Sequence, residues 1–355
     1  MHSTHLRRVH IHGALAGIAI GEALALPRNG FSARRGLKLF GRPGAYQYVA
    51  GLGVYGEHTR LALLYAQSLL NSRNEMSNLR SAFRWRMSWY WASMPPGIRR
   101  STIGAGAKSV LRKLKIDTCT AARDTGALTR AVLSGSVMNG AGHRIVRWVE
   151  ETTKLTHRDA MVLDVNRLIG VLADFGCSNP EEEDVLPALD IVFDVCSEPL
   201  LIEKLKEIKP LLQAGRSPKF AMKHLGWGQV QDDPLQAGVM AAYCWLRYPR
   251  DFRRATSAAC RLGGQVSAVS AVAGGLVGTH AGYKNLPEDL TNSIACAPHN
   301  ATWIKELADR FSHWPHGADD LYMAPAQVSD PLGQVGRSLY YYPLAALHTL
   351  RGRFS

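Results

Sequence analysis

The feature that most constrains this chain is a run of small residues, GGQVSAVSAVAG, at positions 263–274. A glycine inside a helix lets a neighbouring group approach the backbone closely, at an entropic cost that needs a reason. Two glycines open the run, and a second pair, Gly274 and Gly275, follows its Ala, Val and Ser residues. No side chain in its first turn holds a cation or moves a proton well. We therefore interpret the run as a tightly packed helix whose start is approached closely by another group.

Apolar residues recur at helical spacing along most of the chain. Leucines, valines and alanines return every three or four residues, and alternating β-branched runs are scarce, so the pattern predicts helices rather than strands. The expected helices lie at 59–70, 159–175, 187–195, 201–212 and 235–246. We predict an all-α fold, a compact single-domain helical bundle over 1–355, with the acidic stretch 178–184 as a surface connection or a helix start.

Composition narrows the class of protein and its compartment. The chain carries 42 Lys and Arg against 29 Asp and Glu, a formal net charge of +13, which attracts anions without specifying a partner. Its six cysteines form no CxxC pair, which argues against a zinc site and favours buried thiols in a reducing cytoplasm. Glu22 interrupts the apolar stretch near the N-terminus, so we expect a domain helix there, not a signal peptide, and no membrane partner.

Four segments, in order, resemble the ADP-ribosylglycohydrolase family. GALAGIAIGEALALP at 13–27 is similar to the family pattern GxLxGxAxGDALG, and GVYGEHTRLALLYAQSLL at 53–70 stands in the place of TDDTxxxLxxAxSL. SVMNGAGHRIV at 136–146 and LTH at 155–157 are similar to NGxxMR and THxxxxA. The segment 262–290 has the glycine spacing of GGDTDTxAAIxGxLxGAxxGxxxIPxxW. The resemblance covers about residues 13–290 and leaves a C-terminal extension that we expect to pack on the domain.

The resemblance implies a helical bundle with two magnesium ions, which hydrolyses the bond between ADP-ribose and an acceptor. In the family, two aspartates and a threonine at the start of the glycine-rich helix bind magnesium; the matching positions here are Gln265, Ser267 and Ala268. The Thr-Asp-Asp of the second motif is replaced by Gly56, Glu57 and His58. Magnesium needs hard oxygen ligands with anionic help, and one carboxylate does not balance two dications. We therefore expect no metal site, weak or absent magnesium binding, and no other cofactor.

Glu57 and His58 are the candidate catalytic residues. A carboxylate beside an imidazole can act as general base and proton relay without a metal. Together with His143, the pair is also a possible ligand set for one transition metal. In the third interpretation they fill the space of the lost ions and do no chemistry.

The expected substrate-binding residues follow from the same resemblance and are Arg99, Arg100, Asn139, Gly140, Gly142, His143, Arg144, His157, Gly264, Gln265 and Ser267. The two neighbouring arginines would meet a pyrophosphate, and the Asn-Gly turn would lie against ADP-ribose. The alternatives are solvated charges, an ordinary turn and, for His157, a helix cap or a buried histidine. We assign Glu22 a structural role, and Tyr340, Tyr341 and Tyr342 a packing role or that of a lid.

Two classes of function stay open. One is a divergent hydrolase of a glycosidic bond, acting on ADP-ribose or a related ribosylated nucleotide with altered or absent metal dependence. The other is a non-catalytic pseudoenzyme that binds ADP-ribose, an ADP-ribosylated protein or another macromolecular partner, and the loss of carboxylates at two motifs favours it. Nucleic acid is a further possible partner, because FRWRMSWYW at 83–91 mixes arginines and aromatics as stacking proteins do. The same stretch fits an amphipathic helix packed by its tryptophans.

Overall fold

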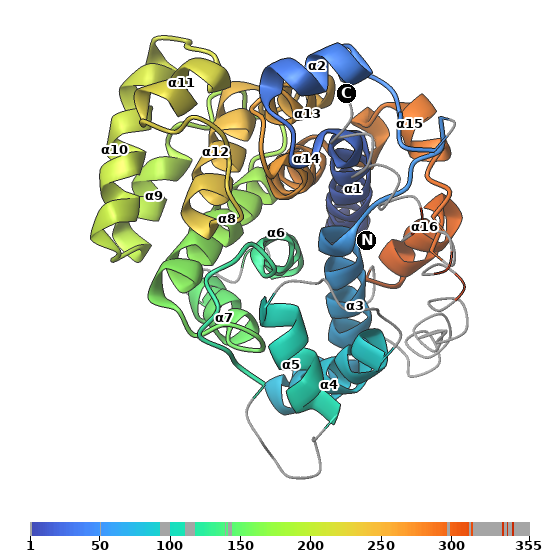
Figure 1. Ribbon diagram of the computed structural model, residues 1–355. Helices are drawn as coiled ribbons and strands as arrows, with labels where there is room; N and C mark the ends of the chain where they lie inside the picture. The colour runs from blue at the N-terminus through green and yellow to red at the C-terminus, as the bar shows by residue number, and fades with distance from the viewer. Residues whose placement is uncertain are drawn as a thin grey trace.

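Helices make up most of the structure (Figure 1). The computed structural model describes residues 2–311 except 50, 93–99, 111–117, 139, 141–143 and 297–298, together with residues 314, 336, 339 and 343. Within these residues the extended pairings are isolated bridges and no sheet occurs, so the all-α prediction is confirmed. The helices are α1 (His2–Ala25), η1 (Leu26–Arg28), α2 (Ala33–Phe40), α3 (Glu57–Ser72), α4 (Met76–Ala92), α5 (Arg100–Val110), α6 (Leu128–Val137), α7 (Arg144–Thr153), α8 (Ala160–Ser178), α9 (Ala188–Val195), α10 (Pro199–Gln213), α11 (Pro218–His224), α12 (Pro234–Arg247), α13 (Phe252–Cys260), α14 (Val266–Ala281), η3 (Tyr283–Asn285), α15 (Glu288–Asn292) and α16 (Ala301–Arg310).

The helices predicted from periodicity are confirmed as α3, α8, α9, α10 and α12. Their starts follow local chemistry: the carboxylate of Asp159 accepts the Val162 amide at the start of α8, and that of Asp233 caps α12 in the same way. The acidic stretch after α8 is an exposed connection to α9, as predicted. The charged residues therefore lie outside the core while the apolar faces of these helices are buried.

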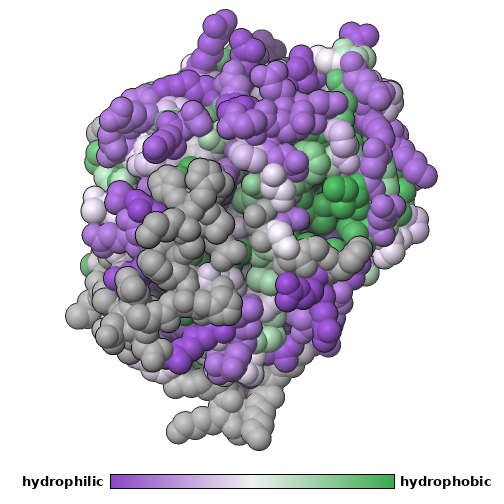
Figure 2. Space-filling model, turned by 180° about the vertical axis from the view of Figure 1, so that it is seen from behind, coloured by the Kyte–Doolittle hydropathy of each residue, from purple (hydrophilic) through white to green (hydrophobic). Residues whose placement is uncertain are grey.

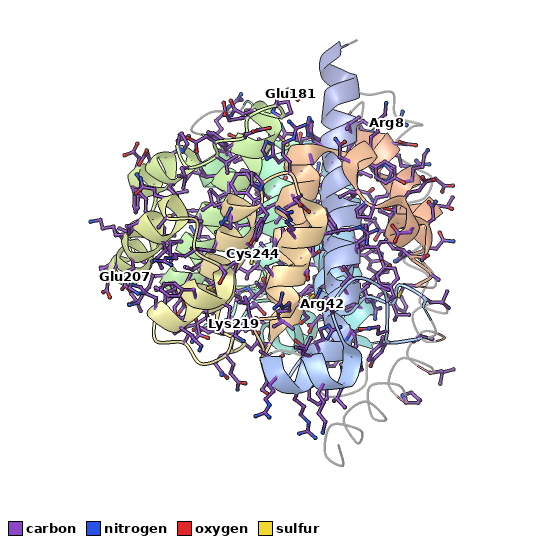
Figure 3. The ribbon with its side chains drawn as sticks, turned by 90° about the horizontal axis from the view of Figure 1, so that it is seen from above. Arg8, Arg42, Glu181, Glu207, Lys219 and Cys244 are labelled. Atoms are coloured by element: carbon purple, nitrogen blue, oxygen red, sulfur yellow. The ribbon has the colours of Figure 1, made fainter. Side chains whose placement is uncertain are left out.

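The centre of the fold is the contact between α1 and α14, two helices that are far apart in the sequence (Figures 1 and 3). A Cβ atom at Gly17 would lie 2.2 Å from the carbonyl oxygen of Gly274, and one at Gly278 would lie 2.0 Å from that of Gly13. Glycine is required at these positions because a backbone, which cannot rotate away, occupies the space. The small-residue run of α14 is thus approached closely along its length by α1.

The apolar character of α1 is also explained by its burial against neighbouring helices. The segment Arg8–Arg28 is long and apolar enough to cross a membrane by length and composition, with a mean hydropathy of 1.5. In the structure 89% of that stretch is buried inside the protein. A core helix passes the same test as a membrane span, so the composition of α1 reflects its place between α14, α3 and α16.

The remaining helices surround this pair. Helices α6, α8, α12 and α13 pack around α14, α9 to α11 form one edge of the molecule, and α15 and α16 form the opposite edge (Figure 1). Helices α4 and α5 pack on each other beyond α3. The face seen in Figure 2 is mostly hydrophilic, with a smaller apolar area. All six cysteines are free and buried, in agreement with the sequence prediction of buried thiols.

Candidate functional site

The first part of the site is the start of α3, which the end of α1 completes. The carboxylate of Glu22 accepts the His58 amide at 3.0 Å, the Thr59 amide at 2.8 Å and the Thr59 hydroxyl at 2.6 Å. Glu22 is 1% exposed. A buried carboxylate at a helix N-terminus satisfies amides that have no partner within the helix and interacts favourably with the helix dipole. The structural role predicted for Glu22 is therefore confirmed.

The second part is the start of α14, which residues just beyond α1 complete in a similar way. Asn29 donates through Nδ2 to Oε1 of Gln265 at 2.8 Å, and its Oδ1 accepts the Ser267 amide at 3.1 Å. Gly264 adopts a φ of +82°, and a Cβ atom there would lie 2.0 Å from the carbonyl oxygen of Val230. The glycines at this helix start thus face the protein's own backbone, and the side-chain oxygen of Gln265 already has a donor.

The third part is the start of α6 together with His157. The Nε2 atom of His157 lies 3.1 Å from Oδ1 of Asp124, and its Nδ1 lies 2.7 Å from the hydroxyl of Thr156. Arg130 donates from Nη2 to the same Thr156 hydroxyl. Burial lowers the pKa of His157, although its hydrogen bond to the carboxylate of Asp124 acts in the opposite direction. Burial also lowers the pKa of Arg130, to about 10.

Hydrogen bonds join these three helix starts to one another. The hydroxyl of Thr129 on α6 donates to the carbonyl of His58 on α3 at 3.0 Å. The hydroxyl of Thr125, just before α6, donates to Oδ1 of Asp232 at 2.5 Å, and the nearby Val230 carbonyl accepts the Gln265 amide at 2.8 Å. The starts of α3, α6 and α14 therefore form one site, which we call the triple helix-start site.

The two predicted catalytic residues lie in different environments within it. Glu57 is the first residue of α3 and is half-buried, so it lies at the triple helix-start site without being enclosed in the core. His58 is 1% exposed, and its backbone is engaged on both sides by Glu22 and Thr129. The imidazole lies in the core, which removes the surface that a proton relay from His58 to solvent requires.

Several predicted binding residues lie elsewhere or outside the described residues. Gly140 donates its amide to Asp174 on α8, and Arg144 is exposed at the start of α7. Both follow the C-terminal end of α6, and the ten residues of α6 put that end roughly 15 Å from the start of α6. Gly140 and Arg144 therefore lie away from the triple helix-start site, and their role in ligand binding stays a prediction. Arg100 begins α5, and the residues outside the described part are Arg99, Asn139, Gly142, His143 and Tyr340, Tyr341 and Tyr342.

The sequence motifs did not identify residues 125–130, which lie at the triple helix-start site. Residues 125–130 read TGALTR and have the same spacing of glycine and arginine as the pattern NGxxMR. Their Thr125, Thr129 and Arg130 contact Asp232, His58 and Thr156, respectively. The Gly-x-x-x-Arg spacing was the available signal, and NGAGHR at 139–144 has it too, with a closer match in its first letter.

The donor set does not fit a two-magnesium centre. Among the residues described, no group of three or more His, Cys, Asp and Glu side chains is arranged to hold a metal ion. At the start of α14 the available atoms are an amide oxygen that accepts from Asn29, a hydroxyl and the methyl group of Ala268. Magnesium prefers carboxylate oxygens in octahedral geometry, which this set does not supply.

The aromatic stretch considered for nucleic acid lies on α4. Phe83, Met87 and Tyr90 are in the core, whereas Trp85, Trp89 and Trp91 are 41%, 37% and 37% exposed. The rings of Trp85 and Trp89 form an edge-to-face pair with centroids 5.6 Å apart. The helix is amphipathic, as one interpretation held, but its tryptophans are on the solvent side.

Comparisons with known proteins agree with this architecture. A family model described as ADP-ribosylglycohydrolase matches residues 2–320. Among solved structures, one described as an "ADP-ribosylglycohydrolase-related protein complex" superposes with a TM-score of 0.58 at 18% identity, covering 86% of this chain and 98% of that one. At that identity the likeness shows the fold. No curated protein matched the chain by sequence.

Proposed function

Because the chain belongs to the ADP-ribosylglycohydrolase family, we propose that it binds an ADP-ribose-like nucleotide, free or attached to a protein, without a two-magnesium centre. The ligand would lie at the triple helix-start site. The observation that carries the proposal is that Glu22 and Asn29 complete the starts of α3 and α14 from within the protein. Protein side chains satisfy the amides at these helix starts, which supports a site that binds its ligand without a metal.

The polar side chains at the triple helix-start site determine which groups of the ligand they would bind. Gln265 and Asn29 are half-buried and present amide groups that can pair with hydroxyls of a ribose. Arg123 is exposed just before the α6 start and is held at 3.2 Å from Asp233, so it offers a cation for a phosphate. His157 and Arg130 are buried, and they would act by positioning the segment that carries Thr125 and Asp124.

Calorimetry tests this function directly. ADP-ribose is titrated into chelator-treated protein, and the titration is repeated with magnesium. We expect the same affinity in both. The matched variant is Gln265→Asp/Ser267→Asp, which returns two carboxylates to the start of α14 and should make binding respond to magnesium. A wild-type protein whose affinity rises tenfold or more with magnesium would contradict the proposal, as would no binding in either condition.

Hydrolysis is the next step for the same site, and the position of Glu57 favours it. A half-buried carboxylate at a helix start can orient a water molecule against an anomeric carbon, where an oxocarbenium-like transition state needs no metal. If the protein releases ADP-ribose from a modified protein, Glu57→Gln should abolish release and leave ADP-ribose affinity within about threefold. Equal turnover by Glu57→Gln would exclude this residue as the base.

The exposed tryptophans of α4 favour nucleic acid as a second candidate ligand. Solvent-facing indoles beside arginines are the groups on which single-stranded bases stack. Binding of a single-stranded oligonucleotide that weakens steeply with salt and is lost in Trp85→Ala/Trp89→Ala would support it. The same affinity in that variant would assign any binding to general positive charge.

A further inference from the structure

A cavity of about 300 Å³ lies between α2, α11 and the end of α13. Figure 3 shows Lys219, on α11, at the edge of the molecule where α11 lies beside α2. Four of the residues that line the cavity are cationic, namely Arg28, Arg34, Lys219 and Arg261, and none is an Asp or a Glu. A concave surface with one sign of charge concentrates ions of the other sign. We call it the α2 cavity.

Arg28 is the buried member of the set, with 3% exposure. Its guanidinium donates to the carbonyls of Gly36 and Phe40 at 2.8 and 3.1 Å and to Oε1 of Gln47 at 2.6 Å. All three acceptors are neutral, and Nε has no acceptor in the described part of the chain. Burial lowers the pKa of Arg28. A buried cation without a counter-charge is costly, and an anion in the adjoining cavity would offset that cost.

The three cations at the rim are exposed and available. The side chains of Arg34, Lys219 and Arg261 form no ion pair or hydrogen bond with any residue that the structure describes. Some other surface cations differ: Arg254, for example, pairs with Asp251, and Lys209 with Asp190. Lys38, Lys206 and Lys284 are exposed without an ion pair in the described part of the chain as well, so the rim is distinguished by having three such cations around one concavity.

The walls of the cavity include a close contact between Gly263 and the start of α2, and apolar side chains. Gly263 has a φ of +87°, and a Cβ atom there would lie 2.5 Å from the Ala33 amide nitrogen at the start of α2. Any side chain at this position would block the helix start. Phe31 and Leu37 line the cavity as well, and Leu37 is 47% exposed. The cavity thus combines a cationic side with an apolar wall.

We propose that the α2 cavity binds a small phosphomonoester with an apolar or aromatic body, at a site separate from the triple helix-start site. Near neutral pH a phosphomonoester carries close to two negative charges, which suits a buried arginine surrounded by further cations. The volume is at the lower end of the range for small-molecule sites, about 300 to 1,000 Å³. The apolar wall distinguishes an ester from inorganic phosphate.

Phenyl phosphate is a probe of this chemistry, with inorganic phosphate and phenol as its two halves. We expect calorimetry on the full chain to show tighter binding of phenyl phosphate than of either half. The variant Lys219→Ala/Arg261→Ala removes two exposed rim cations without touching the core, and should weaken binding by at least about tenfold. The matched control, Lys206→Ala/Arg147→Ala, removes the same charge from exposed positions on α10 and α7 and should change the affinity less than about threefold.

Three results would overturn the inference. The first is no binding of phenyl phosphate by the wild-type protein at millimolar concentration. The second is an equal loss in the rim and control variants, which would mean non-specific attraction to a basic surface. The third is competition between phenyl phosphate and ADP-ribose, which would place both ligands in one site. Retention of ADP-ribose binding by Lys219→Ala/Arg261→Ala would show that the two sites are independent.

Discussion

The tightest test of the fold is the substitution Gly17→Ala in α1. The new Cβ would lie 2.2 Å from the Gly274 carbonyl oxygen and 2.8 Å from its carbon. A carbon and a carbonyl oxygen approach to about 3.3 Å, so α1 and α14 must separate by about 1 Å. A gap of this size removes about a quarter to a half of the van der Waals attraction between the atoms that move apart. The obstacle is backbone, which has no rotamer to change.

The magnitude follows from two opposing terms. Overpacking costs about 1–3 kcal/mol and occasionally more, and a backbone obstacle puts this site at the upper end. Alanine recovers about 1 kcal/mol through its helix propensity. We expect Gly17→Ala to lower the free energy of unfolding by about 2 kcal/mol or more.

Urea unfolding followed by far-UV circular dichroism measures this change, and α2 supplies the control. At Gly36 a Cβ atom would meet its nearest neighbour, Cβ of Arg28, at 3.7 Å, an ordinary contact. Gly36→Ala should therefore be neutral or stabilising by up to about 1 kcal/mol. The reasoning is refuted if Gly17→Ala unfolds within about 0.5 kcal/mol of the wild type, or if Gly36→Ala is equally destabilised.

Two further predictions concern buried polar groups. Glu22→Gln removes the charge from three hydrogen bonds at the start of α3 and places an amide N–H₂ group against amide donors. We therefore expect urea unfolding to show a free energy of unfolding lower by about 2–3 kcal/mol. A decrease no larger than that caused by Glu57→Gln would show that solvent can replace the cap. His12, 5% exposed and stacked on Tyr283, has its pKa lowered by burial to about 4. Between pH 6.5 and about 4 the unfolded chain binds a proton at His12 that the folded protein does not, so stability should fall as the pH decreases, by up to about 1.4 kcal/mol per pH unit from this group. His12→Phe, which keeps the aromatic contact, should flatten the dependence of the urea midpoint on pH, and an unchanged slope would mean that other groups dominate it.

The helices were predictable because apolar periodicity is local. Leu201, Leu205 and Ile208 stand on one face of α10 in the sequence and are buried in the structure. The partner of the glycine run was not predictable in this way. Gly274 and Gly278 need glycine because of α1, which lies far away in the chain, and periodicity carries no information about that distance.

The residues of the candidate site show a second limit of prediction from the sequence. NGAGHR at 139–144 and TGALTR at 125–130 share a spacing, and letters alone favour the first. The hydrogen bonds of Thr129 and Arg130 assign the second to the site, and these depend on how α6 packs against α3. Likewise, the mixture of arginines and aromatics in FRWRMSWYW fitted an amphipathic helix but did not show which side chains would be buried, because Phe83 and Trp85 are both apolar.

The pairing of α1 with α14 has a consequence for how the protein is made. The ring of His10 lies against the carbonyl of Thr279, 269 residues later in the chain. At about 5–20 residues per second, α1 leaves the ribosome roughly 15–50 s before its partner is synthesised. During that interval α1 lacks the helix that covers its small-residue face, so that face is open to chaperones or other temporary contacts. The contact between α1 and α14 can form only after residue 281 has been synthesised.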